Sequence, residues 1–426
     1  MSARALALDL LEAVLRRGRP LDEVIEAHPG FPRLAPRDRA FARLLAATVL
    51  RRLGQIDALI DGCLERPLKG KAAPARDLLR LGLAQLLFLD TPAHAAVHDT
   101  VGLAAARRVP GQRGLINAVL RRLADAGPAL LAAQDAARLN TPGWLWRSWT
   151  AAYGEATARA IAAAHLSEPP LDITVKDDPQ RWAARLSARL LPTGTLRRPA
   201  GGAVTELPGF AEGDWWVQDA AAALPVRLMG DVSGKTVIDL CAAPGGKTAQ
   251  LAALGASVIA VDRSRRRLRR LVRNLDRLRL GVATVEADAT RWTPPAPADA
   301  VLVDAPCSTT GAIRRHPDVA WIKTPADVAR MAALQGRLLA AAANLIRPGG
   351  TLVFCTCSLE PEEGPERVAE LLAAGVPLAR RPVRAAEIGG LKDCLTADGD
   401  LRTLPCHLGA EGGLDGFYAA RLERTV

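Results

Sequence analysis

Two cysteines in the C-terminal half of the chain each follow an apolar run that is typical of a buried strand. Cys307 lies in the motif DAPCS (304–308) after residues 300–303, and Cys357 lies in the motif TCS (356–358) after residues 351–354. Because ligands of open α/β sheets bind at the carboxyl ends of the strands, we expect both thiols at that edge. Two reduced thiols beside a carboxylate, here Asp304, suit few reactions, and one of these is methylation of a pyrimidine carbon.

Methylation at C5 of cytosine would give these side chains distinct roles. C5 is a poor nucleophile until a thiolate adds to C6, after which C5 can attack an activated methyl group. The reaction also needs an acid or hydrogen-bond partner near N3 or N4, for which Asp304 is the candidate, and the base must leave its stack. The residue types leave open which cysteine attacks, and either cysteine alone could be a small buried apolar side chain.

A zinc site is the alternative use of these thiols, because Cys355 and Cys357 form a C-x-C pair. Structural zinc takes four ligands, and the sequence has no second pair at ligand spacing. His94, His98 and His316 are isolated in the sequence and read as surface or satisfied core side chains. We therefore predict no metal.

A glycine-containing turn after the predicted strand 236–240 is the candidate site for a methyl donor. Its paired glycines allow a ligand close to backbone N–H groups, and the next helix begins there, so its amides face the ligand. Acidic residues at strand ends can bind ribose and base, although a lone aspartate there could equally cap a helix. Several such acids favour a nucleoside cofactor. The candidate cofactor residues are Cys241, Ala242, Ala243, Pro244, Gly245, Gly246, Lys247, Asp262, Asp288 and Asp304.

The elements around these motifs predict three regions. Residues 1–128 have apolar positions at helical spacing and predict an all-α domain, with arginines between the apolar positions. Residues 129–228, which include a tryptophan cluster at 144–149 and an alternating strand-like run at 171–176, predict a linker and a small α+β insert. Residues 229–426 alternate strands with helices and predict a parallel, doubly wound α/β sheet domain.

Composition points to a polyanionic partner. The chain of 426 residues carries a formal net charge of +11, which suits nucleic acid, although an arginine-rich proteome would have the same effect. The seven cysteines are odd in number and irregularly spaced, so we expect reduced thiols in the cytoplasm. The N-terminus lacks a signal-peptide pattern and no apolar run is long enough to cross a bilayer, so no membrane partner is expected.

Residues 144–426 resemble the RNA cytosine-C5 methyltransferases that use S-adenosylmethionine. The resemblance rests on the turn 241–247, the acids Asp262, Asp288 and Asp304, and the two cysteine motifs. It implies a Rossmann-like class I methyltransferase sheet with S-adenosylmethionine bound by the turn and the acids. It also implies that Cys357 is the nucleophile, that Cys307 assists product release, and that Asp304 contacts N3 or N4 of the base.

The N-terminal region resembles the NusB fold, an RNA-binding helical domain, through residues 92–97 and 117–122. A NusB-like domain before such a catalytic domain is similar to methyltransferases of 16S rRNA. The resemblance implies a monomer acting on 16S rRNA or an early small-subunit particle. The alternatives are a tRNA cytosine-C5 methyltransferase and a non-catalytic RNA-binding or antitermination module. The chain departs from the family pattern at residues 174–176, where the family's insert contacts the base, and at Cys355 and Gly364. None of these departures touches the proposed chemistry directly.

Overall fold

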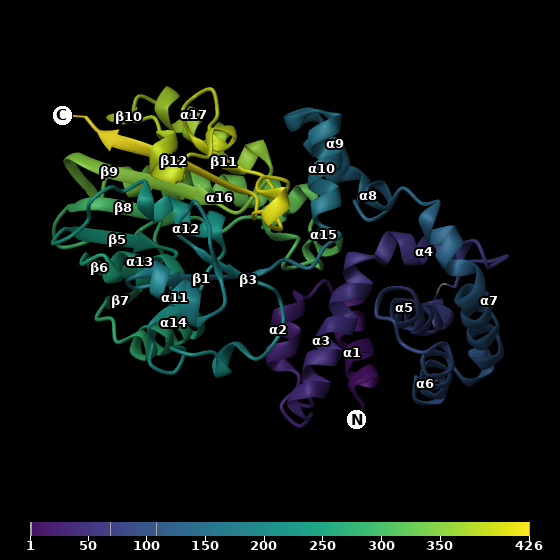
Figure 1. The fold of residues 1–426 in the computed structure, drawn as a ribbon. Coiled ribbons are helices and arrows are strands. Elements are labelled where there is room, and N and C mark those ends of the chain that lie inside the picture. Colours follow the sequence, from purple (N-terminus) through teal and green to yellow (C-terminus); the bar gives the residue numbers. More distant parts are fainter. Residues whose placement is uncertain (1, 69, 108, 426) are drawn as a thin grey trace. The chain divides into compact units, whose positions relative to one another are not determined.

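The computed structural model describes residues 2–68, 70–107 and 109–425, which fold into two units (Figure 1). The first unit comprises the chain up to Ser167 together with Arg315–Lys323. The second unit comprises Glu168–Arg314 and the chain from Thr324 onward.

The first unit is all-helical, as the sequence predicts. Its first helix illustrates why the helices form: Ser2 accepts a hydrogen bond from the N–H of Ala5 at 3.2 Å, and Gly18 ends the helix with φ 63°. Between these caps, Leu6, Leu10 and Val14 recur at helical spacing and are fully buried. The described helices are α1 (Ala3–Arg17), α2 (Leu21–Ala27), α3 (Pro36–Arg51), α4 (Leu53–Asp61), α5 (Ala73–Phe88), α6 (Ala93–Ala106), α7 (Arg113–Ala132), α8 (Ala136–Leu139), α9 (Gly143–Tyr153), α10 (Glu155–Ala164) and α15 (Val319–Ile322).

The helical unit extends further along the chain than residue 128, where the sequence suggests a boundary. The tryptophan cluster 144–149 lies on α9 and not in the α+β insert. Trp149 is 1% exposed, with its ring centroid 5.3 Å from that of His165, and Asn140 donates to Gln55 Oε1 at 2.9 Å. The Asn140–Gln55 hydrogen bond joins residues 129–167 to the preceding helices, which helical periodicity in one segment cannot reveal.

A short segment from the C-terminal half also belongs to the helical unit. The indole N–H of Trp321 on α15 donates to the carbonyl of Leu50 at 2.7 Å, and Asp318 accepts from the N–H of Leu21 at 3.0 Å. Burial raises the pKa of the Asp318 carboxyl.

The α+β insert of the second unit is a four-stranded antiparallel sheet in the order β2-β3-β1-β4. Its core contains Ile173, Trp182, Leu196 and Trp215. The predicted strand 171–176 is confirmed as β1. The elements are β1 (Leu171–Val175), α11 (Pro179–Arg185), β2 (Arg189–Leu190), β3 (Leu196–Arg198) and β4 (Trp215–Val217).

The large sheet has the order β10-β12-β9-β8-β5-β6-β7, with β11 paired to β12 (Figure 1). The predicted parallel pairing is confirmed from β9 to β7, but it is wrong for β12, which runs antiparallel to β9. An apolar run predicts a strand but not its direction. The irregular segment 404–416 precedes β12 and leads the chain into the sheet in the direction opposite to β9. The strands are β5 (Thr236–Leu240), β6 (Ser257–Asp262), β7 (Ala283–Glu286), β8 (Ala298–Asp304), β9 (Ile346–Thr356), β10 (Leu378–Arg380), β11 (Leu401–Thr403) and β12 (Phe417–Arg424).

Helices cover both faces of this sheet because alternate strand residues point to opposite faces. Val237 and Leu302 pack in one core with residues of α12 and α13, whereas Ile238 and Val301 pack in another with residues of α16 and α17. The helices of this domain are α12 (Ala220–Arg227), α13 (Gly246–Ala253), α14 (Arg265–Leu278), α16 (Pro325–Ala343) and α17 (Pro365–Ala373).

Candidate active site

The carboxyl ends of five parallel strands place the candidate residues in one row. Along the sheet, β9 and β8 carry the cysteine motifs, β5 carries the glycine turn, and β6 and β7 lead to Asp262 and Asp288. The chain runs from β5 outward to β7 and then returns to the other side of β5 as β8. Such a reversal of strand order opens a crevice for ligands. The expected shared edge is therefore confirmed.

The two thiols meet at the ends of the neighbouring strands β8 and β9. Cys307 Sγ and Cys357 Sγ lie 3.4 Å apart, and both side chains are half-buried, so they remain open to a ligand. Donation from the Cys307 thiol lowers the pKa of Cys357, and the Lys247 ammonium lowers it further. The same hydrogen bond and burial raise the pKa of Cys307. The opposite directions of the two pKa shifts favour Cys357 over Cys307 as the thiol that ionises.

Asp304 ends β8 beside these thiols and is held by Lys247. The Lys247 ammonium donates to Asp304 Oδ2 at 2.8 Å and lies 4.8 Å from the centroid of the Phe417 ring. Burial has the largest single effect on Lys247 and lowers its pKa, but Asp304, together with Cys355 and Cys357, raises the pKa overall. Cys355 is opposite Asp304 in the strand register and donates to Asp304 Oδ1 at 3.6 Å. Lys247 and Cys355 thereby orient the carboxylate.

The glycine turn leads from β5 into α13. Gly245 has φ 103°, and a Cβ there would lie 3.0 Å from Leu271 Cγ, so glycine suits both the conformation and the space. No side chain caps α13 at Gly245, which leaves its first amides available for a ligand. Burial raises the pKa of the Cys241 thiol to about 12, so this third thiol stays protonated. Cys241 lies beside the proposed chemistry without a nucleophilic role.

Asp262 ends β6 and is 2% exposed. It accepts hydrogen bonds from the N–H groups of Ala243 at 3.3 Å and Ser264 at 2.9 Å, and Arg267 lies 3.3 Å from its Oδ2. The following helix is capped by Ser264, so the cap alternative does not explain Asp262. The carboxylate ties the glycine turn to the end of β6.

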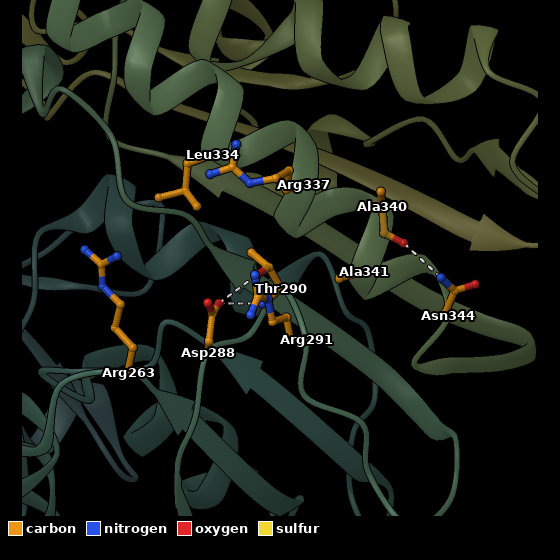
Figure 2. A pocket seen from close by; sticks show the side chains of 9 residues that line it. All are labelled: Arg263, Asp288, Thr290, Arg291, Leu334, Arg337, Ala340, Ala341 and Asn344. Carbon is orange, nitrogen blue, oxygen red and sulfur yellow. Dashed lines mark hydrogen bonds between the residues drawn. The ribbon is translucent and has the colours of Figure 1, made fainter.

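A groove of about 560 Å³ begins at Asp288 and runs along α16 (Figure 2). Asp288 lies two residues beyond the end of β7, and hydrogen bonds from Thr290 lower the pKa of its carboxyl. Arg263 and Arg291 stand on the same side of the groove as Asp288, and Arg337 lies on α16 across from them (Figure 2). All three arginines are exposed, so the groove favours an anionic ligand.

A smaller pocket adjoins this groove and shares Arg263, Asp288 and Leu334 with it. Cys241, Asp262 and Pro306 also line this pocket. It therefore connects the glycine turn, the strand-end acids and the loop of Cys307, as a nucleoside methyl donor would require. The candidate cofactor residue Lys247 does not line it and contacts Asp304 instead.

Asp239 near the end of β5 adds an acceptor that belongs to none of the motifs in the sequence. Its Oδ2 accepts from the Thr248 hydroxyl at 2.6 Å, whereas its fully buried Oδ1 has no hydrogen-bond partner among the described residues. Burial raises the pKa of this carboxyl to about 7. A free acceptor beside the glycine turn suits a ligand that carries a cationic donor, as the methionine end of S-adenosylmethionine does.

The structure explains two of the departures from the family pattern. Lys176 donates to the carbonyl of Leu278 at the end of α14, so it fastens the insert to this helix. A Cβ at Gly364 would lie 3.0 Å from the Tyr418 ring and 3.1 Å from the Arg402 guanidinium, which leaves little room for asparagine.

Sequence reasoning missed the role of Glu363, a fully buried carboxylate behind the thiols. Glu363 lies in the acidic pair Glu362-Glu363. Each of the two cysteines is followed by a serine, and this repeated serine is the feature of the sequence that indicates a shared polar partner.

Across residues 2–68, 70–107 and 109–425, no group of three or more His, Cys, Asp or Glu side chains is arranged to hold a metal ion. Within the same residues, no helix is both long and apolar enough to span a bilayer.

Comparisons with known proteins cover the whole chain. A family model described as 16S rRNA methyltransferase RsmB/F matches residues 227–423, and a NusB family model matches residues 1–125. Ribosomal RNA small subunit methyltransferase B of Klebsiella pneumoniae subsp. pneumoniae is 36% identical, covering 99% of this chain and 98% of its own. The Vibrio cholerae protein of the same description is also 36% identical, covering 100% and 98%.

Solved structures show the same fold. The crystal structure of PH0851 aligns with a TM-score of 0.76 at 22% identity, covering 100% of this chain and 99% of that one. NSun6 from Pyrococcus horikoshii with SFG aligns with a TM-score of 0.55 at 20% identity, covering 67% and 98%. The chain thus combines a NusB-like helical domain with a Rossmann-like methyltransferase domain.

Proposed function

The chain belongs to the RsmB/F family of 16S rRNA methyltransferases, and we propose that it methylates C5 of a cytidine in 16S rRNA through a covalent cysteine–C6 adduct. The observation that carries the proposal is the pair of thiols 3.4 Å apart at the ends of β8 and β9, beside Asp304. A non-catalytic RNA-binding module has no use for a thiol of lowered pKa next to a second thiol and an oriented carboxylate.

Cys357 attacks in this proposal because its pKa is the lowered one. Its Sγ forms a bond with C6, and Asp304 contacts N3 or N4 of the base, which directs electron density to C5. S-adenosylmethionine, when bound, supplies an electrophilic methyl group for C5. Water or another base then takes the C5 proton, the electron pair of the C5–H bond restores the C5=C6 double bond, and the Sγ–C6 bond breaks with its electron pair returning to Cys357.

Cys307 assists that release. Its raised pKa keeps it a thiol, and a thiol that donates toward Cys357 Sγ stabilises the departing thiolate. The same hydrogen bond lowers the pKa of Cys357 before attack, so Cys307 supports attack as well, but only release requires it to stabilise a departing thiolate.

The residues present fit S-adenosylmethionine. The turn 241–247 would offer backbone amides to the methionine end, with Asp239 Oδ1 as a nearby free acceptor. Asp262 would bind the ribose hydroxyls, and Asp288 would lie near the adenine. The pocket that Cys241, Asp262, Asp288 and Pro306 line supports this assignment.

An RNA substrate is supported by the net charge of +11 and by the NusB family match. We assign contacts with RNA phosphates to Arg263, Arg291 and Arg337, because all three are exposed around one groove. The choice of 16S rRNA over tRNA rests on the relatives that cover the full chain and are described as acting on small-subunit rRNA. We expect a cytoplasmic monomer.

The test is methyl transfer from labelled S-adenosylmethionine to 16S rRNA, to early small-subunit particles and to tRNA, followed by bisulfite sequencing of the product. We expect one labelled cytidine in 16S rRNA, with no incorporation by Cys357→Ala. Incorporation into tRNA alone would favour the tRNA alternative, and no incorporation into any RNA would overturn the proposal.

A further inference from the structure

A buried polar network lies behind the two reactive thiols. The residues that follow the cysteines are both serines, and Ser308 and Ser358 are fully buried. Glu363, at the end of the short 3-10 helix Pro361–Glu363, is also fully buried and lies between them. Three buried polar side chains beside a reaction centre need a reason, because unpaired polar groups are costly there.

Hydrogen bonds between the Glu363 carboxylate and the two serines satisfy all three side chains. Glu363 Oε1 accepts the backbone N–H of Ser308 at 2.8 Å, and Oε2 accepts the Ser358 hydroxyl at 2.6 Å. The Ser308 hydroxyl also donates to Oε2. Each cysteine loop is therefore attached to the same carboxylate one residue beyond its thiol.

Neighbouring residues fix the carboxylate and the loops in turn. Gln335 on α16 donates to Glu363 Oε1 at 3.3 Å and to the carbonyl of Pro306 at 2.8 Å, next to Cys307. The N–H of Gly311 donates to the carbonyl of Cys357 at 3.0 Å, which joins the loops a second time. Burial raises the pKa of Glu363, while the hydrogen bonds from Ser308 and Ser358 oppose that effect.

We propose that Glu363 is a positioning residue that fixes Cys307 against Cys357 by fastening both cysteine loops to one carboxylate. The inference rests on the proposed function for its meaning in catalysis, but the positioning itself can be measured without RNA. Attack on C6 forms a bond to Cys357 alone and is only assisted by the hydrogen bond from Cys307, whereas release requires Cys307 to be placed beside the departing thiolate. Loss of Glu363 should therefore slow release more than attack.

Glu363→Ala and Glu363→Gln separate positioning from general support of the fold. Alanine removes every side-chain bond to Ser308 and Ser358. Glutamine keeps one oxygen for the Ser308 N–H and can donate from its amide to a serine hydroxyl, so it should restore much of the function. Glu362→Ala is the matched control, because Glu362 is adjacent and exposed.

The direct test is oxidation of the full-length protein with diamide, which takes up two electrons and two protons as Cys307 and Cys357 form a disulfide. Mass spectrometry of the linked peptides gives the rate. Because a displacement of about 1 Å can cost about 100-fold in rate, we expect Glu363→Ala to react at least about 10-fold more slowly than wild type. Glu362→Ala should react at the wild-type rate, and Glu363→Gln at a rate near it.

A wild-type rate in folded Glu363→Ala would overturn the proposal. If Glu363→Ala does not fold, Ser358→Ala removes only one bond to the carboxylate and should slow the linkage by a smaller factor; an unchanged rate there would also overturn it.

Turnover with RNA then shows the catalytic consequence. We expect Glu363→Ala to lower kcat, with KM for RNA unchanged, and to raise the fraction of enzyme held as a covalent RNA adduct. Slow linkage in the variant together with no methyl transfer by wild type would leave the positioning intact and reject the proposed function. Unchanged linkage with normal wild-type methylation would reject only the role of Glu363.

Discussion

The two ends of the row of strand termini in the catalytic domain are built in opposite ways. At β8 and β9, the thiols stand on loops held by buried hydrogen bonds to Glu363. At β6 and β7, the groove beside Asp288 is exposed and lined by arginines with space between them (Figure 2). Covalent chemistry requires fixed geometry, whereas a ligand that enters and leaves requires an open, charged surface. Changes at one end should therefore leave the other end unaffected.

Asp262→Asn should have the largest effect at the donor end. The substitution removes the charge from a buried carboxylate that accepts two backbone hydrogen bonds. In the proposed site, this carboxylate also accepts a hydrogen bond from the ribose of the ligand. A hydrogen bond to a charged group contributes about 1.5–3 kcal/mol, so affinity for S-adenosylhomocysteine should fall about 10- to 100-fold in calorimetry. The rate of the Cys307–Cys357 linkage should remain that of wild type. Equal losses in both measurements would contradict the separation of the two ends.

Arg337→Gln should have a smaller effect that depends on salt. If Arg337 contacts a phosphate, the slope of log affinity for RNA against log salt should fall by about 1. Fluorescence anisotropy at several salt concentrations measures it. Lys392→Gln, which removes an exposed charge outside the groove, is the matched control. The same slope change in both variants would assign the effect to net charge and not to the groove.

Asp239→Asn should have the smallest effect, and its size should depend on pH. The pKa of Asp239 is about 7 in the folded protein, against an ordinary value of 3.8, because of burial. The folded state binds the Asp239 proton more tightly than the unfolded state does. Protonated Asp239 therefore contributes fully to stability below pH about 4, and this contribution is lost as pH rises through about 7. The melting temperature of Asp239→Asn should therefore rise relative to wild type between pH 5 and 8, at roughly 2–4 °C per kcal/mol. A difference that stays constant with pH would show that burial of this charge is not the cause.

The sequence predicted much of the site because strand ends carry it. The runs before Asp262, Asp304 and Cys357 are each confirmed as strands, and parallel pairing of β8 with β9 brings cysteines 50 positions apart into contact. The direction of β12 was not predictable, because alternation and apolar content do not encode it. The helical placement of residues 144–149 was missed because a tryptophan cluster says little about which domain buries it.

The partners of individual side chains were also beyond the sequence. The pairing of Lys247 with Asp304, in place of a contact in the donor pocket, depends on how α13 leaves the turn. Glu363 reaches Ser308 across 55 positions, which only the assembled sheet makes adjacent. The roles of Cys357 and Cys307 came from family resemblance, and the opposite directions of their pKa shifts agree with them.

Covalent trapping of RNA distinguishes the roles of the two thiols. After incubation with 16S rRNA and S-adenosylmethionine, Cys307→Ala should give a protein–RNA band that survives a denaturing gel, because loss of the hydrogen bond to Cys357 only slows attack, whereas release is blocked. Cys357→Ala should give no such band, and Cys406→Ser, a half-buried thiol outside the site, should behave as wild type. A band with Cys357→Ala and none with Cys307→Ala would show that Cys307 attacks and Cys357 assists release.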